Sequence, residues 1–344
     1  MPDSLETIST PVMELAAGCA PAATTLAEAA QPVVLRGIAK DWALTSQSAS
    51  GPASAAAYLK PFYNGRPSMI YRAPASINGR YFYTDDASSL NYQSVTGRVD
   101  TFLDELATET QDESLYMASA PLDKFFPGLK DAVRFSQPAQ LNPNAQYDPL
   151  VSIWVGNKSL ASCHFDNMEN IACCVAGQRR VIVFPPEQIA NLYPGPVERT
   201  PGGQVISMVD FHQPDQARYP RFAEALKHAQ IAKLAPGDGI FIPSMWWHQV
   251  EGLSHFNVLV NYWWSQAPML AGSGMPALFH AMLAIRDRPE REKAAYKALF
   301  DYYVFGDSRL PHAHLPEAGK GVLGNLNEVT ARRLRAMIIN QLNK

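Results

Sequence analysis

Two short segments far apart in the chain carry side chains that can share one metal ion. The first contains His164 and Asp166, and the second, well downstream, ends at His248. Residues two apart on a strand point to the same face, so His164 and Asp166 enter one cavity if residues 159–167 are extended. Two imidazoles and one carboxylate form the facial triad that holds non-haem Fe(II) and leaves positions open for other ligands. Bringing His248 to the same ion requires distant strands to meet, as in an antiparallel barrel or a two-sheet sandwich.

The residues before His248 strengthen this interpretation. The chain has 8 histidines, so a His-x-Asp pair alone carries little weight. A turn-forming segment, Pro236–Gly239, is followed by a short apolar run to Pro243 and then by Trp246 and Trp247. Pro and Gly mark such a turn between strands, and the two large apolar side chains would keep water away from the histidine. We therefore predict a metal site built from His164, Asp166 and His248.

Residues 149–264 have the pattern of a β-domain. Short apolar and β-branched runs recur there, separated by turn signals such as the hairpin signal Ala176–Gln178. The predicted strands are 149–155, 160–167, 169–175, 179–184, 204–209, 230–234, 239–242, 246–251 and 256–264. Many short strands of this kind favour a sandwich or barrel.

Helical patterns flank the β-domain on both sides. On the N-terminal side we predict helices at 15–30, 53–62 and 99–106 and strands at 32–36, 68–72, 80–84 and 114–117. On the C-terminal side we predict three helices, at 275–286, 290–303 and 326–342. This helical tail either packs on the β-domain or supplies a dimer interface, and the pattern leaves both open.

The charge, the apolar runs and the cysteines of the chain indicate which partners and which cell compartment to expect. The 344 residues carry a net charge of −3, which gives no basic surface of the kind that general nucleic-acid binding needs, so such a partner is disfavoured. No apolar run approaches the ~20 residues of a membrane span, and the first residues lack the basic stretch of a signal peptide. The 4 cysteines, two of them the adjacent Cys173 and Cys174, form no paired framework. We expect a cytoplasmic protein.

Several segments together resemble a known enzyme family. The matching stretches are His164–Asn170, Gly177–Pro186, Leu192–Pro194, Ile242–His248 and Asn261–Trp263. They resemble the JmjC and cupin-like Fe(II)/2-oxoglutarate-dependent oxygenases, and most closely the asparaginyl hydroxylases, over roughly residues 30–265. The resemblance implies a mainly β fold: a double-stranded β-helix (cupin or jelly-roll) core at 121–267, wrapped by N-terminal strands and helices at 1–120. It also implies a C-terminal helical region at 268–344, which such proteins often use for dimerisation.

The resemblance also assigns roles to single residues. His164, Asp166 and His248 would bind Fe(II), while Asn170 and Asn261 would lie near the iron-bound carboxylate of 2-oxoglutarate. The resemblance also implies that Tyr116 would donate a hydrogen bond to the other carboxylate of 2-oxoglutarate and that Arg179 would anchor it. Arg180 is the alternative anchor if the register slips by one.

The chain departs from the family's pattern at two of these positions. A lysine of the family is replaced by Arg179, which can bind a carboxylate with two hydrogen bonds. A threonine three residues before the first ligand is replaced by Ala161, so its hydroxyl must come from Ser162 or from water.

The predicted function is oxidation by iron, 2-oxoglutarate and O2. By resemblance, the enzyme would hydroxylate a C–H bond, first on a protein or peptide side chain, second on a small molecule and third on an RNA base. The alternatives are a non-catalytic metal-binding cupin-like protein, a cupin isomerase and a thiol dioxygenase. The choice of substrate depends on loops such as 135–148 and 195–203, and the C-terminal helices are a candidate homodimer contact.

Overall fold

The computed structural model describes residues 4–108, 112–135 and 149–343. Most of the predicted loop 135–148 lies outside the described residues. The chain divides into two compact units, residues 1–266 and residues 267–344. Each unit is described by itself below.

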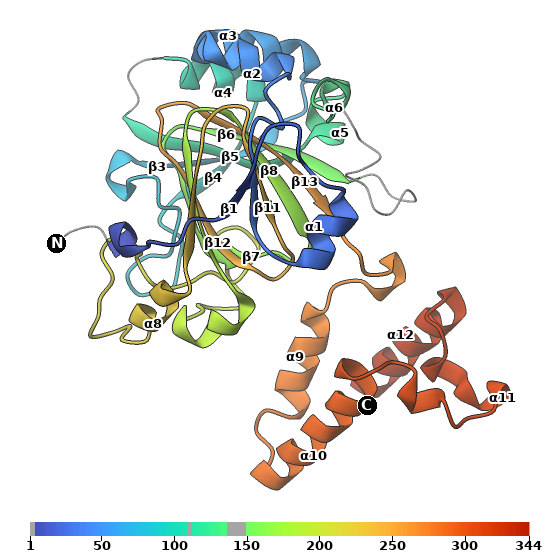
Figure 1. The fold of residues 1–344 in the computed structure, drawn as a ribbon. Coiled ribbons are helices and arrows are strands. Elements are labelled where there is room, and N and C mark those ends of the chain that lie inside the picture. Colours follow the sequence, from blue (N-terminus) through green and yellow to red (C-terminus); the bar gives the residue numbers. More distant parts are fainter. Residues whose placement is uncertain (1–3, 109–111, 136–148, 344) are drawn as a thin grey trace. The chain divides into compact units, whose positions relative to one another are not determined.

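The first unit is built on two sheets, and the strands that carry His164 and His248 belong to the smaller one (Figure 1). The larger sheet has the order β1-β2-β11-β8-β13-β6-β5-β3-β4, and only the β1–β2 pair is parallel. Its strands are β1 (Met13–Leu15), β2 (Val33–Leu35), β3 (Ser68–Pro74), β4 (Gln93–Gly97), β5 (Glu113–Pro121), β6 (Leu150–Gly156), β8 (Glu169–Ala176), β11 (Gly239–Ile242) and β13 (Asn257–Trp264). The smaller sheet, in the order β10-β9-β12-β7, consists of β10 (Gln230–Leu234), β9 (Arg179–Phe184), β12 (Trp247–Gly252) and β7 (Leu160–Phe165).

Strand alternation divides the core into two layers. On β8, Cys173 packs with the helices on the outer side of the larger sheet, whereas Cys174 packs with Val181 and Val183 of the smaller sheet. Successive residues of a strand face opposite sides, so one strand serves both layers. All four cysteines are free, as expected. The two facing sheets with flanking helices confirm the predicted jelly-roll class.

Helices cover one face of the larger sheet, as Figure 1 shows for α2, α3 and α4. The α-helices of the first unit are α1 (Ala23–Ala29), α2 (Ala43–Ala49), α3 (Pro52–Leu59), α4 (Val99–Leu106), α5 (Leu122–Phe125), α6 (Leu129–Ala132) and α8 (Phe222–Lys227). Short 3-10 turns add η1 (Ser4–Thr7), η2 (Lys60–Phe62), η3 (Ala75–Ile77) and η4 (Pro186–Asn191). Buried Phe102 and Leu103 of α4 explain the helical spacing of its apolar residues.

Residues 204–209 were predicted as a strand, and this prediction is wrong. The segment makes only isolated bridges, from Ile206 to His164 and from Ser207 to Pro194. The Ser207 hydroxyl donates to the Leu192 carbonyl and accepts the Val209 N–H, so local side-chain bonds replace a strand ladder. The apolar alternation of the segment serves packing against Leu192, which follows η4, and against α8.

On the N-terminal side, two other predictions need correction and one strand was missed. Residues 80–84 form isolated bridges instead of a strand. The helix predicted at 15–30 is confined to α1, after the short strand β1. β4 was not predicted, because it is a partly exposed edge strand of polar composition that pairs only with β3.

The second unit is helical. It contains η5 (Met269–Ala271), α9 (Met275–Ala284), α10 (Glu290–Phe300), the π-helical η6 (Asp301–Phe305), η7 (Leu310–His312), α11 (Glu317–Lys320), η8 (Gly321–Leu323) and α12 (Glu328–Leu342). An Asn327 capping box begins α12. Within the described part of the chain, no helix has both the length and the apolar character required to cross a bilayer.

Candidate metal centre and cosubstrate pocket

The three predicted metal ligands meet across the smaller sheet. His164 lies on β7 and His248 lies directly opposite on the antiparallel neighbour β12. Asp166 follows the end of β7. The two imidazole centroids are 4.3 Å apart, and His248 Nε2 is 3.7 Å from Asp166 Oδ2. One candidate ligand atom from each residue lies within 4.8 Å of the others, a spacing at which all three can reach one ion.

Backbone carbonyls fix the orientation of both histidines. His164 Nδ1–H donates to the Ser162 carbonyl (2.8 Å), and His248 Nδ1–H donates to the Trp246 carbonyl (3.0 Å). Since each ring then carries its proton on Nδ1, each Nε2 lone pair is free for a metal. Burial, together with the neighbouring His164, lowers the pKa of His248 to about 4. A histidine that stays neutral is ready to bind a metal ion.

A strained turn joins the two ligand segments. Met245, between β11 and β12, has a left-handed backbone (φ 67°), and its N–H donates to the Asp166 carbonyl (2.7 Å). The next N–H upstream, that of Ser244, donates to Glu169 (3.0 Å). A non-glycine residue at positive φ costs about 1–2 kcal/mol and persists where the surroundings require it. The turn therefore holds His248 in register with Asp166.

A cavity of about 190 Å³ surrounds the ligands. All seven residues predicted from the sequence line it: Tyr116, His164, Asp166, Asn170, Arg179, His248 and Asn261. They come from β5, β7, β8, β9, β12 and β13 and the residue after β7, so both sheets contribute. Trp154 and Trp263 are the tryptophans that line this cavity, whereas Trp246, Trp247 and Trp264 are buried elsewhere in the core.

Arg179 is a buried cation without a counterion among the described residues. Its residue exposure is 3%, and its Nε and Nη2 have no hydrogen-bond partner. Burying an unpaired charge is expensive, so such a site is suited to an anionic ligand. The cavity lined by the three candidate metal ligands is thus also lined by a buried cation.

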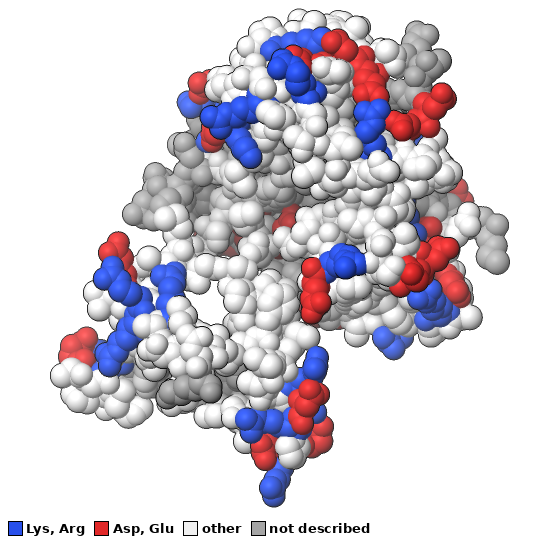
Figure 2. All heavy atoms as spheres, turned by 180° about the vertical axis from the view of Figure 1, so that it is seen from behind, with Lys and Arg blue, Asp and Glu red and all other residues white. Residues whose placement is uncertain are grey.

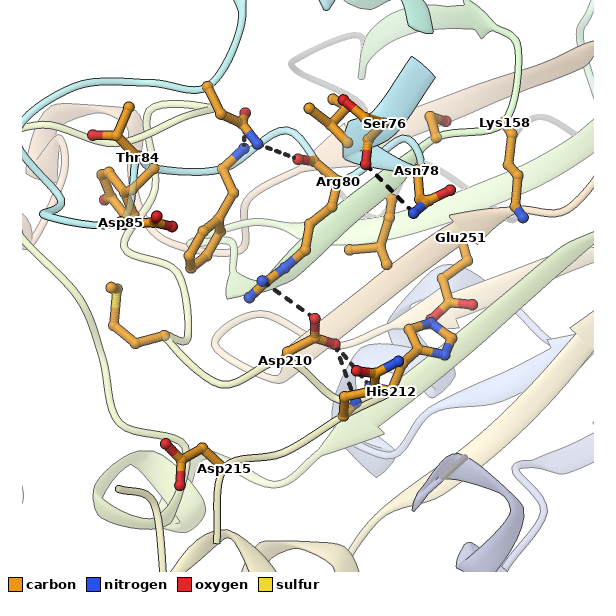
Figure 3. A pocket seen from close by; sticks show the side chains of 18 of the residues that line it. Ser76, Asn78, Arg80, Thr84, Asp85, Lys158, Asp210, His212, Asp215 and Glu251 are labelled. Atoms are coloured by element: carbon orange, nitrogen blue, oxygen red, sulfur yellow. Dashed lines mark hydrogen bonds and ion pairs between the residues drawn. The ribbon is translucent and has the colours of Figure 1, made fainter. Parts of the chain in front are cut away.

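Arg180 faces the opposite side of the sheet. It forms an ion pair with buried Glu251 (Arg180 Nη2 to Glu251 Oε2, 2.7 Å), and both residues line a different, larger cavity of about 730 Å³. Figure 3 shows that cavity, with Glu251 beside His212 and with Arg80 directed at Asp210. Burial acts to raise the pKa of Glu251, but His212 and Arg180 outweigh it and leave that pKa below its usual range. Arg179 therefore lines the cavity of the candidate metal ligands, whereas Arg180 lines the other cavity.

A short polar chain connects the two predicted asparagines. Trp154 Nε1 donates to Asn261 Oδ1 (2.7 Å), and Asn261 Nδ2 donates to Asn170 Oδ1 (3.3 Å). Both asparagines are buried, so these bonds set the orientation of their amides. The Asn170 side-chain nitrogen remains available to a ligand in the cavity.

Tyr116 belongs to a group of stacked rings. Its ring lies 5.5 Å from that of Tyr81 and 6.2 Å from that of Trp154. Burial raises the pKa of Tyr116, although Arg179 opposes the shift, so its hydroxyl keeps its proton and can donate. The sequence prediction missed Tyr71 and Tyr81, which also line the cavity. The sequence contains no pattern for these two residues other than several tyrosines upstream of the β-domain.

A hydroxyl is present where Ala161 lacks one. Ser162 Oγ lines the cavity, is buried and has no hydrogen-bond partner in the structure. Ser162 thus shares the cavity with Ala161 and His164. It is therefore placed to supply the donor that the change to alanine removed.

The chain is similar to a known domain family and to several known proteins. A model of the cupin-like domain matches residues 21–269. Among curated proteins, Lysine-specific demethylase JMJ31 of Arabidopsis thaliana is 34% identical over 127 residues, which is 37% of this chain and 22% of that protein. HSPB1-associated protein 1 of Homo sapiens is 35% identical over 116 residues (33% of this chain, 23% of that protein).

A further relative covers a larger share of both chains. The tRNA wybutosine-synthesizing protein 5 of Danio rerio is 32% identical over 168 residues, 46% of this chain and 48% of that protein. The chain thus spans less than half the length of each of these three relatives. With the cupin-like match over most of its length and with JmjC-type relatives, the chain belongs to the cupin-like JmjC family of Fe(II)/2-oxoglutarate oxygenases.

Proposed function

We propose that the protein is an Fe(II)- and 2-oxoglutarate-dependent dioxygenase that hydroxylates a C–H bond on a protein or peptide side chain. The observation that carries the proposal is the pairing of two features in one cavity: the His164, Asp166 and His248 cluster and the cation of Arg179, which has no counterion among the described residues. A metal-binding protein without catalysis would have no use for a buried, uncompensated arginine, which makes that alternative the weaker one.

Different residues of the cavity would bind the metal ion and the cosubstrate. His164, Asp166 and His248 would hold one face of the ion and leave the other positions open. Arg179 would pair with the far carboxylate of 2-oxoglutarate, with hydroxyls of Tyr116 and Ser162 as further donors. Trp154 and the other rings exclude water. The bound metal and cosubstrate supply the oxidising chemistry with O2, which converts 2-oxoglutarate to succinate and CO2.

The size of the cavity supports a side chain as the substrate. Sites that enclose a whole small molecule usually measure roughly 300–1,000 Å³. About 190 Å³ is available here for the cosubstrate and the reacting group together. A substrate that inserts a single side chain and keeps its remainder outside satisfies this limit.

Charge distribution speaks against RNA as the substrate. On the face seen in Figure 2, Lys and Arg alternate with Asp and Glu and form no continuous basic surface. The net charge is −3. Since phosphate contacts dominate nucleic-acid affinity, a protein or peptide substrate is favoured.

Turnover of 2-oxoglutarate tests the proposal directly. Purified protein supplied with Fe(II), ascorbate and 2-oxoglutarate is expected to release succinate slowly, and faster when peptide pools are added. Mass spectrometry of those peptides is expected to reveal a gain of one oxygen atom. A protein that binds Fe(II) but neither binds nor consumes millimolar 2-oxoglutarate would contradict the proposal.

We further propose that the helical unit pairs with a second copy of the chain. Among its described residues only Pro311 and Ala331 are buried, whereas Leu283, Ile338 and Leu342 are more than half exposed. Burying one such side chain contributes about 1.5–3 kcal/mol. In a two-fold pair the same apolar surface is covered on both copies at once.

Light scattering checks this pairing. The wild-type protein is expected to be a dimer at micromolar concentration, and the double variant Ile338→Glu/Leu342→Glu a monomer. Ala336→Glu/Asn340→Glu adds the same two charges to exposed positions on the opposite side of α12 and should leave the dimer intact. A monomeric wild type at this concentration would contradict the pairing.

A further inference from the structure

Residues 197–205 form one wall of the metal cavity but have few attachments. Pro201, Gly202 and Gln204 line the cavity. All residues of this segment are described, and the structure gives it two hydrogen bonds. Tyr83 Oη donates to the Arg199 carbonyl (2.6 Å), and Tyr92 Oη donates to the Pro201 carbonyl (2.5 Å). Both bonds come from tyrosine hydroxyls more than 100 residues upstream.

The segment has room to move if those bonds are lost. A Cβ atom built on Gly202 or on Gly203 would meet nothing within 4 Å, and Gly203 has a positive φ of 90°. Glycine adopts many backbone conformations, so such a pair resists ordering. Val205, by contrast, is buried and anchors the C-terminal end. The position of the cavity wall therefore depends on the two tyrosines.

The two donors are themselves held firmly. Tyr83 is 4% exposed, and the Tyr92 ring packs 4.7 Å from Tyr71 and 5.3 Å from Tyr81, both of which line the cavity. The loop that carries them is closed by Asn91, whose side chain accepts the Phe82 N–H (2.9 Å) and donates to the Arg80 carbonyl (3.0 Å). Residues 197–205 are thus the less firmly held side of this contact, and the two tyrosines hold them in place.

We propose that Tyr83 and Tyr92 act as a two-hydroxyl latch that positions residues 197–205 as the substrate-side wall of the metal cavity. The assignment of this wall to the substrate rests on the proposed oxygenase function, but the latch itself does not. Both tyrosines are positioning residues, because they act through the segment and do not line the metal cavity themselves. Replacing either by phenylalanine removes the donor and keeps the ring, so the packing of the tyrosine group is retained.

Trypsin digestion measures how often the segment opens. Trypsin cleaves after the exposed Arg199, and the carbonyl of that bond is the one that accepts the hydrogen bond from Tyr83. Cleavage of a native protein follows the population of the open form when opening is fast. From the net contribution of one hydrogen bond, cleavage at Arg199 is expected to rise about 5-fold in Tyr83→Phe and in Tyr92→Phe, and about 30-fold in the double variant. The fragments are identified by mass, and hydrogen exchange of residues 197–205 gives a second readout.

The control removes an equivalent bond elsewhere. Tyr63 Oη donates to the Arg66 carbonyl (2.7 Å), and Tyr63→Phe is expected to leave cleavage at Arg199 unchanged. Affinity of the Mn(II)-loaded protein for 2-oxoglutarate should stay within about twofold in the latch variants, whereas general loosening of the barrel would lower it. Unchanged cleavage and exchange in folded single or double variants would overturn the latch. If the wild-type protein fails to bind 2-oxoglutarate, the oxygenase function fails while the cleavage result still decides the latch.

Discussion

Replacement of His164 by alanine is expected to reduce Fe(II) affinity and succinate formation by about 100-fold or more. Loss of groups that merely orient a metal ligand already lowers affinity about 10- to 100-fold, and His164 is itself one of three candidate ligands. Its Nε2 has no substitute among the described residues of the cavity, because the remaining candidates are Asp166 and His248. Equilibrium dialysis with Fe(II) or Mn(II) and a succinate assay measure the two effects separately.

His255→Ala is the matched control for this variant. His255 is exposed and does not line the metal cavity, so its loss should change neither metal binding nor turnover. The His164→Ala protein should remain folded, since the histidine adds little to the apolar core. Retention of stoichiometric metal by folded His164→Ala would refute the assigned ligand set.

Replacement of Arg179 by methionine is expected to change ligand affinity and stability in opposite directions. Two charge-assisted hydrogen bonds to a carboxylate, at about 1.5–3 kcal/mol each, predict a loss of 2-oxoglutarate affinity of about 100- to 1,000-fold or more. Without ligand, however, the methionine removes an uncompensated buried charge. Exchanging buried charge for an apolar side chain is often neutral or stabilising, so the ligand-free variant should melt at the same temperature as the wild type or higher.

Arg180→Met gives the opposite pattern and serves as the control. It leaves buried Glu251 without its closest cation, which should destabilise the fold by roughly 2–4 kcal/mol. Affinity for 2-oxoglutarate should be nearly unchanged, because Arg180 lies on the other face of the sheet. Calorimetric titration of 2-oxoglutarate into the Mn(II)-loaded variants, with thermal unfolding, measures both quantities. Equal affinity in Arg179→Met and wild type would move the anchor elsewhere.

Strand alternation explains why much of the site was predictable. The side-chain period of two places His164 and Asp166 on one face of an extended segment, whatever the strand pairs with. The predicted strands at 160–167, 179–184 and 239–242 agree with β7, β9 and β11. The resemblance to the oxygenase family supplied the remaining candidates, and the fold brings all of them to one cavity. Their roles stay predictions until they are measured.

The strand prediction at 204–209 failed because the alternation of apolar and polar residues there is not caused by a strand. Residues 204–209 alternate because Val205 and Val209 pack into a cluster with Leu192 and α8, while Ser207 bonds to nearby backbone. β4 was missed because it is a strand without apolar alternation, since its edge position leaves polar residues exposed. In both cases the neighbours in space, which sequence patterns do not contain, decided the conformation.

The sequence by itself determined the strand-rich architecture and the spacing of a three-ligand metal set, because these depend on local periodicity and residue chemistry. The tertiary structure alone decided which arginine faces the cavity. That choice depends on the register of β9 against β12, where Arg180 pairs with Glu251 and Arg179 with Gly252. It also revealed the contact of Tyr83 and Tyr92 with residues 197–205. Bonds from a side chain to a distant backbone carbonyl leave no trace in the sequence, since every residue type offers the same carbonyl acceptor.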